Sequence, residues 1–194
     1  LDEIAWVTNL RGSDIEYNPV FEAYLAIDST RATCFSRTMP DNEVLTQLGS
    51  LIEFRPYTDY SEAMKAVSAV SSGIVWLDNS GTTMGTRLLF SSQQQVNESL
   101  NPVVMLKAIK NEAEISASRD SHRHAGAAKI RSIKRLQEHI ADGQAVSELG
   151  YSDILYEEYA REEGFCDLSF TTIAAAGANG AIVHYSEASP DVQL

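Results

Sequence analysis

The chain has few cysteines, and they fall into no recognisable pattern. Cys34 and Cys166 are the 2 cysteines among 194 residues, and they form neither a C-x-x-C pair nor a dense framework. This argues against a disulfide-stapled secreted domain and favours a reducing, cytoplasmic location. Because free cysteines are usually buried, we expect both thiols to lie in the interior as small hydrophobic side chains.

Long apolar runs and basic residues are also scarce. No run approaches the ~20 residues of a membrane-spanning helix, and the opening LDEIAWVTNLRG lacks the basic-then-apolar order of a signal peptide. The 15 Lys and Arg residues are outnumbered by 27 Asp and Glu residues, so the net charge is −12. Since phosphate binding needs a basic face, nucleic acid is not an expected partner, and neither is a membrane.

The first part of the chain alternates short apolar runs with helical patterns, up to a boundary at Asn101-Pro102. Such β-α-β alternation predicts an α/β layer domain over residues 1–102. The expected strands are Ile4–Thr8, Val20–Ile27, Arg31–Ser36, Leu51–Arg55 and Ile74–Leu77, the second and third forming a hairpin. The expected helices are Asp41–Leu48 capped by Asp41, Tyr60–Ser71 capped by Asp59 and ended by Gly73, and a weaker one over Thr82–Phe90.

From Val103 the pattern becomes helical. One apolar face is formed by Leu106, Ile109, Ala113 and Ile115, and a second, within the helix Ala125–Ile140, by Ala127, Ile130, Ile133, Leu136 and Ile140. Basic residues occupy the opposite face of that helix, which is either a solvated surface or a surface for an acidic partner. Ser147 is expected to cap a further helix that runs to Glu163, with Glu148 in its first turn.

Two groups of residues outside this framework invite a functional interpretation. Arg11, in the loop NLRG, either closes over a neighbouring active site or pairs with Asp14 or a backbone carbonyl. His122 and His124 are two positions apart, so their rings point to different sides of a helix. They are a poor metal pair, and no metal site is assigned to them.

The stretch Gly164–Tyr185, GFCDLSFTTIAAAGANGAIVHY, resembles the opening of the catalytic domain of aminopeptidase P. These are the Xaa-Pro aminopeptidases of the creatinase/methionine-aminopeptidase ("pita-bread") group. The family pattern reads F-x-D-L-S-F-x-T-I and then G-x-N-G-A-I-x-H-Y. The earlier residues LDEIAW, NLRGSD and NPVF resemble the second N-terminal domain of the three-domain members.

The resemblance implies the fold. Residues 1–102 are expected to form a creatinase N-terminal-like mixed sheet flanked by helices. Residues 103–194 are expected to form a linker helix and the first helices and strands of a truncated pita-bread α+β domain. An incomplete sheet leaves unpaired edges, so we expect Val103–Leu194 alone to need a partner chain or to be poorly stable.

The resemblance also implies chemistry. Family members cleave peptides with proline in second position, act as homodimers, and use two divalent metal ions, Mn or Zn, held by two Asp, one His and two Glu. None of these ligands is matched here, so no metal residue is assigned. His184 matches the family's histidine, which donates a hydrogen bond to the substrate or to the developing oxyanion; it is expected on a short strand after a turn at Asn179-Gly180. Tyr185 and Phe170 are either pocket walls or core residues.

Three interpretations of the chain stay open. The first is a fragment of a dimetal Xaa-Pro aminopeptidase that is inactive alone. The second is a non-catalytic dimerisation or binding module, and the third is a creatinase-like hydrolase of another C–N bond.

Overall fold

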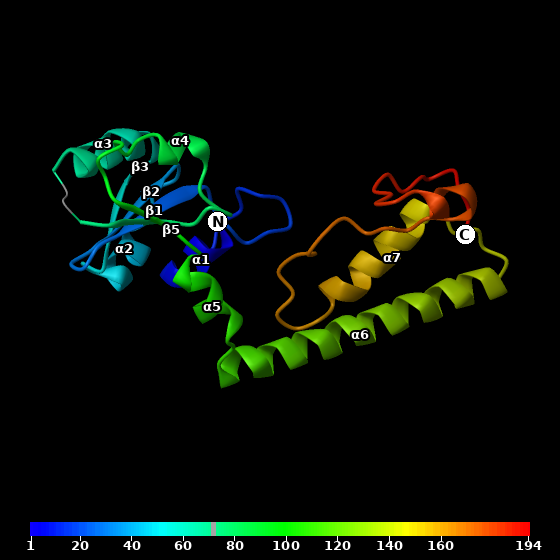
Figure 1. The fold of residues 1–194 in the computed structure, drawn as a ribbon. Helices are drawn as coiled ribbons and strands as arrows, with labels where there is room; N and C mark the ends of the chain where they lie inside the picture. Colours follow the sequence, from blue (N-terminus) through cyan, green and yellow to red (C-terminus); the bar gives the residue numbers. More distant parts are fainter. Residues whose placement is uncertain (71–72) are drawn as a thin grey trace. The chain divides into compact units, whose positions relative to one another are not determined.

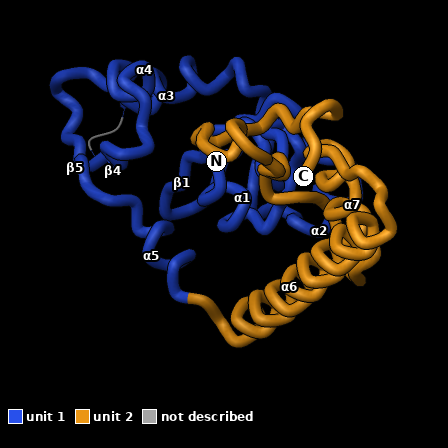
Figure 2. Tube along the Cα trace, turned by 90° about the vertical axis from the view of Figure 1, so that its right-hand side faces the viewer, with its two compact units in different colours: residues 1–109 blue, residues 110–194 orange. Residues whose placement is uncertain are grey.

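The computed structural model describes residues 1–70 and 73–194, and the chain divides into two compact units, Leu1–Ile109 and Lys110–Leu194 (Figures 1 and 2). The division lies one short helix, α5 (Pro102–Ala108), beyond the boundary that the sequence suggested at Asn101-Pro102. Within the described residues, no helix is both long enough and apolar enough to cross a bilayer.

A mixed three-stranded sheet, in the order β1-β2-β3, forms the centre of the first unit (Figure 1). β1 (Ala23–Ile27) and β2 (Ala32–Ser36) pair antiparallel, which confirms the predicted hairpin, and β2 pairs parallel with β3 (Ile52–Pro56). A parallel pair needs a crossover connection, and α2 (Asn42–Leu48) supplies it. Asp41 caps α2 as expected, because its carboxylate accepts from Val44 N at 2.9 Å.

Further elements complete this unit. They are α1 (Asp2–Thr8), the 3-10 helix η1 (Tyr57–Asp59), α3 (Tyr60–Val70), β4 (Val75–Leu77), α4 (Met84–Arg87) and β5 (Val96–Glu98), with β4 and β5 paired in parallel. The mixed α/β architecture predicted from the alternating pattern is therefore present. The predicted end at Ser71 of the helix that begins at Tyr60 lies outside the described residues.

Each face of the sheet has its own hydrophobic cluster, because neighbouring residues of a strand point to opposite faces. Cys34 of β2 packs with Ala5, Phe21 and Ala23. Phe35, the next residue, packs on the other side in a cluster formed with Tyr60, Met64 and Phe90. The ring of Tyr60 also stacks on Tyr24 with centroids 3.8 Å apart. These two clusters hold α1 and α3 against the sheet.

Three local predictions in this unit are wrong. Ile4–Thr8 is not a strand but most of α1: its apolar run is too short to distinguish the two periodicities, and Ala5 and Thr8 are buried at helical spacing. Asp59 does not cap α3, since it ends η1 and its carboxylate binds Arg55 at 3.1 Å. The expected helix Thr82–Phe90 shrinks to α4, and β5 was not predicted.

The second unit is built on two helices, α6 (Glu112–Ala141) and α7 (Glu148–Ala160). Asn111 begins α6 with a capping box, in which its side chain accepts from Glu114 N and its own N–H donates to the Glu114 carboxylate, both at 2.9 Å. The continuous apolar face expected from Leu106 to Ile115 is therefore interrupted. Ile109 ends α5 in an extended conformation, with ψ at 101°.

The predicted inward face of α6 is wrong for its three isoleucines, while Ala127 and Leu136 are half-buried. Ile130, Ile133 and Ile140 are exposed, whereas Ala128 and Ser132 are fully buried. Arg131 and Arg135 meet acidic residues of α7, whereas Arg123 and Lys134 are exposed to solvent. Each of the two open interpretations of the basic face therefore holds for part of it, and the acidic partner of the paired part is this same chain. Apolar spacing alone did not identify the buried face, because charged side chains form this contact.

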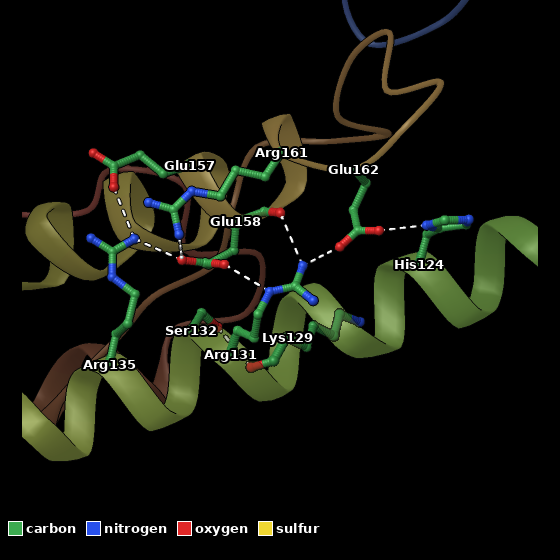
Figure 3. A network of polar contacts seen from close by, with 9 residues as sticks. All are labelled: His124, Lys129, Arg131, Ser132, Arg135, Glu157, Glu158, Arg161 and Glu162. Carbon is green, nitrogen blue, oxygen red and sulfur yellow. Dashed lines mark hydrogen bonds and ion pairs between the residues drawn. The ribbon is translucent and has the colours of Figure 1, made fainter.

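An ion-pair network joins α6 to α7 (Figure 3). The fully buried carboxylate of Glu158 binds Arg131 at 2.9 Å, Arg135 at 2.9 Å and Arg161 at 2.5 Å. Arg131 also binds Glu162, which in turn binds His124. Hydrogen bonding to Arg131 is the largest of the effects that lower the pKa of Glu158. A buried charge needs such partners, so this network determines how the two helices pack.

Candidate functional site

The candidate site is formed where the start of α7 meets the C-terminal residues. Ser147 caps α7 as predicted, accepting from Gly150 N at 3.1 Å. Glu148 follows in the first turn, where a negative charge is favoured by the helix dipole. Its side chain is fully buried, which is rare for a glutamate without close partners.

The partners of Glu148 come from the segment Ala176–Ser189. Backbone N–H groups of Ala176 and Ser189 donate to its carboxylate at 2.6 and 3.0 Å. The Asn179 amide donates to both oxygens at 3.1 and 3.2 Å, and the Tyr185 hydroxyl donates at 2.7 Å. Asn179 also donates to the Tyr185 hydroxyl at 3.0 Å, which closes a three-membered polar cluster.

This arrangement keeps Glu148 ionised. Desolvation by burial raises the pKa of its carboxyl, but the hydrogen bonds from Ala176, Ser189, Tyr185 and Asn179 outweigh burial and lower the pKa to about 2. In turn, the hydrogen bond to Glu148 raises the pKa of Tyr185. The tyrosine is therefore a hydroxyl donor to a carboxylate at neutral pH.

His184 lies between these anchoring residues but takes no part in the cluster. It is exposed, and its backbone has a positive φ of 56°. The short strand on which it was expected is absent, and the preceding turn is the 3-10 helix η2 (Gly177–Ala181). A strand exists only beside another strand, and none of the described residues pairs with Ile182–Tyr185. The turn was expected at Asn179-Gly180, but the residue of this turn with a positive φ is Gly177.

The structure thus brings together part of what the sequence suggested. Tyr185 and Asn179 meet, with Asn179 acting through its amide rather than through its backbone. Phe170 is exposed, so it is not a core residue. Glu148 was not anticipated as the centre of the site. Its place after a helix cap is the only sequence signal, and nothing in that position indicates burial.

The other sequence candidates have structural partners. Arg11 donates to the carbonyls of Ala5 and Leu10 at 2.8 and 2.9 Å, so the backbone-pairing interpretation is confirmed. His122 lies 2.7 Å from the carbonyl of Ser118, and His124 binds Glu162.

The two thiols differ in environment. Cys34 is fully buried, and burial raises its pKa to about 11, whereas Cys166 is exposed. The expectation of two buried thiols is therefore wrong for Cys166.

The residues present do not fit a dinuclear metal centre. Within residues 1–70 and 73–194, no cluster of three or more His, Cys, Asp or Glu side chains is arranged to hold a metal ion. Glu148 and Glu158, the two fully buried carboxylates, are already saturated by hydrogen bonds and ion pairs.

Comparison with known proteins relates both units to one kind of enzyme. Residues 1–114 match the creatinase/prolidase N-terminal domain, and residues 120–194 match metallopeptidase family M24. A probable Xaa-Pro aminopeptidase P of Aspergillus fumigatus is 35% identical over 195 residues, 95% of this chain and 30% of that protein. An Xaa-Pro aminopeptidase of Drosophila melanogaster is 32% identical, again over 95% of this chain and 30% of that protein.

A solved structure shows the same relationship. The crystal structure of an X-prolyl aminopeptidase from Caenorhabditis elegans, described as a cytosolic enzyme with a di-nuclear active site, superposes with a TM-score of 0.79. It is 27% identical and covers 90% of this chain, which corresponds to 29% of that one. The chain thus spans about 30% of the length of these relatives. These matches confirm the resemblance read from the motifs: the chain belongs to the creatinase/prolidase N-terminal domain family, and its residues 120–194 match metallopeptidase family M24.

Proposed function

We propose that this chain is part of an Xaa-Pro aminopeptidase, which removes the N-terminal residue that precedes a proline. The observation that supports this most strongly is the match along 95% of the chain to proteins named as such enzymes. The bond in question is a tertiary amide without an N–H, and proline also restricts the residue before it. Recognition of such a bond therefore needs a dedicated site rather than generic backbone contacts.

Within that enzyme, His184 is the proposed catalytic residue of this chain. Its imidazole is exposed, so it is free to donate a hydrogen bond to the substrate carbonyl or to the oxyanion that develops from it. Tyr185 is the proposed second substrate-side residue. Its hydroxyl is occupied by Glu148, so any contact with substrate is made by the ring.

The complete enzyme is proposed to use two divalent metal ions, Mn or Zn, which activate water and polarise the scissile carbonyl. Since the described residues offer no such site, we propose that the chain alone is inactive. The enzyme is further proposed to be cytoplasmic, by analogy with the nematode protein's description as cytosolic. The proposal that it is a homodimer rests on the family resemblance alone.

The test uses the longer protein that contains this sequence, purified with Mn²⁺ or Zn²⁺. It is assayed against an Xaa-Pro peptide panel, the matching Xaa-Ala peptides and creatine. Cleavage restricted to Xaa-Pro peptides, with a loss of about 100-fold or more in kcat for His184→Ala, is the expected result. Turnover of creatine instead would establish the creatinase-like alternative, and no turnover with a stable dimer would establish the binding module.

A further inference from the structure

The segment Ala176–Ser189 is held at four of its residues by one carboxylate, and its last carbonyl, that of Ser189, also accepts from Leu149 N at 3.2 Å. Hydrogen bonds to Glu148 begin at Ala176, recur at Asn179 and Tyr185, and end at Ser189. His184 lies inside this span and immediately before Tyr185. Any movement of the Glu148 carboxylate is therefore transmitted to the backbone on both sides of His184.

The backbone of His184 also needs such support. A left-handed backbone conformation is unfavourable for a residue with a side chain, and His184 adopts it with a φ of 56°. Residues persist in such conformations only where the surrounding structure holds them, and such positions cluster at functional sites. The Tyr185 hydroxyl, 2.7 Å from Glu148, is the anchor nearest to this strained position.

We propose that Glu148 is a positioning residue, which acts through Tyr185 and Asn179 to hold His184 in the orientation that presents its imidazole to substrate. This inference rests on the proposed function in so far as His184 is the group presented. Glu148 itself does not touch substrate, because it is fully buried beneath the segment that it holds.

A carboxylate is particularly suited to this place. All the groups around Glu148 are donors: two backbone N–H groups, an amide N–H and a phenol hydroxyl. An ionised carboxylate is purely an acceptor, with about four lone-pair positions. Glu148→Gln keeps the size of the side chain but turns an NH₂ group toward at least one of these donors. The variant therefore removes the clamp with little change of volume.

The kinetic test is made on the longer enzyme with an Xaa-Pro peptide. For Glu148→Gln we expect kcat to fall about 10- to 100-fold while KM changes less than about threefold, since a displacement near 1 Å has effects of this size. Tyr185→Phe, which removes one hydroxyl, should give a smaller fall of the same kind. Because the two residues act as a unit, the double variant should be no slower than Glu148→Gln alone.

The matched control is Glu158→Gln. Glu158 lies on the same helix and is equally buried, but its partners are Arg131, Arg135 and Arg161 rather than the segment Ala176–Ser189. We expect it to lower the thermal midpoint while leaving kcat within about twofold. If Glu158→Gln lowered kcat as much as Glu148→Gln does, general destabilisation would explain both losses, and the proposal would be overturned.

A second measurement separates this inference from the proposed function. Amide hydrogen exchange of the longer protein that contains this chain is followed by mass spectrometry in the wild type and in both glutamine variants. We expect Glu148→Gln to raise exchange at least tenfold in peptides spanning 176–189, and Glu158→Gln to leave them unchanged. This result supports the clamp even if the longer enzyme does not cleave Xaa-Pro peptides. Unchanged exchange in Glu148→Gln overturns it even if the enzyme does.

Discussion

At the scale of single residues, the environment of a side chain decides its effect, and two glycines illustrate this. A Cβ added at Gly12 would lie 2.6 Å from Phe21 Cβ, whereas one added at Gly126 would meet nothing within 4 Å. At Gly12 the loop after α1 comes close to Phe21, which belongs to the hydrophobic cluster formed with Ala5, Ala23 and Cys34, called the first core cluster below. Gly126 lies in the middle of α6, where glycine only weakens the helix.

We therefore predict opposite effects of alanine at the two positions. Gly12→Ala should lower the free energy of unfolding of the first unit by about 1–3 kcal/mol through overpacking. Gly126→Ala should raise that of the second unit by about 0.5–1 kcal/mol. Both tryptophans, Trp6 and Trp76, lie in the first unit, so their fluorescence in urea reports on Gly12→Ala. Far-UV circular dichroism reports on α6, and equal effects of the two substitutions would contradict this account.

The lowered pKa of Glu148 predicts how the free energy of unfolding depends on pH. Its pKa is lowered in the folded state from 4.5 to about 2, so the folded protein binds this proton less readily than the unfolded chain. The contribution of the Glu148 carboxylate to the free energy of unfolding is therefore fully present above pH 4.5 and is lost as the pH falls toward 2. The stability difference between wild type and Glu148→Gln should therefore be largest near neutral pH and shrink over this window.

Urea unfolding of both proteins at several pH values measures this difference. Since Glu158 and Glu162 also have lowered pKa values, acid destabilises both proteins, and the difference between them isolates Glu148. A stability difference that stays constant down to pH 2 would show that Glu148 is not the group responsible.

At the scale of elements, the contact between α6 and α7 depends on charge rather than on apolar area. Glu158 is surrounded by Arg131, Arg135 and Arg161, while Ile130 and Ile133 of α6 are exposed. Removing one member of a buried ionic group leaves other charges without their partner. The helix pair should therefore be more sensitive to a change at Glu158 than to changes at these isoleucines.

We predict that Glu158→Gln lowers the thermal midpoint of the second unit by about 5 °C or more. Glu163→Gln, at an exposed position just after α7, should shift it by less than about 1 °C because surface charges contribute little. Thermal scans by far-UV circular dichroism compare the two variants. A similarly small shift of the thermal midpoint in both variants would mean that the ion-pair network orients α6 and α7 but does not stabilise the second unit.

At the scale of the whole molecule, the two units differ in how much core they possess. The first unit has a cluster on each face of its sheet. In the second unit the buried apolar residues are Ala128, Val146, Ile154 and Ala174, and large apolar side chains such as Ile173 and Val183 are exposed. Because burial of apolar surface is the main favourable term in folding, the second unit should be much less stable by itself.

We predict that residues 1–109 expressed alone unfold in one cooperative transition, whereas residues 110–194 alone unfold gradually or associate. Differential scanning calorimetry and analytical ultracentrifugation of the two segments test this. A sharp, cooperative transition of monomeric 110–194 would contradict the prediction. It would mean that the α6–α7 network replaces an apolar core.

The sequence alone determined the features that depend on local chemistry or on a distinctive motif. Asp41 and Ser147 cap helices because each is a short polar residue directly before a helical pattern. The hairpin across Asp28-Ser29-Thr30 forms because two β-prone runs are joined by a short polar turn. The motif around His184 was enough to identify the family, because its many residues match together. These predictions required no knowledge of distant contacts.

Tertiary structure decided the features that depend on what lies opposite each residue. Ile4–Thr8 is a helix because the first core cluster accepts a helical face, and the isoleucines of α6 are exposed because arginines meet α7 instead. Burial of Glu148 depends on donors that follow it by 28 to 41 positions, which no local pattern reveals. The expected strand at His184 is missing for the same physical reason: a strand, like a buried carboxylate, is stable only with its hydrogen-bonding partner.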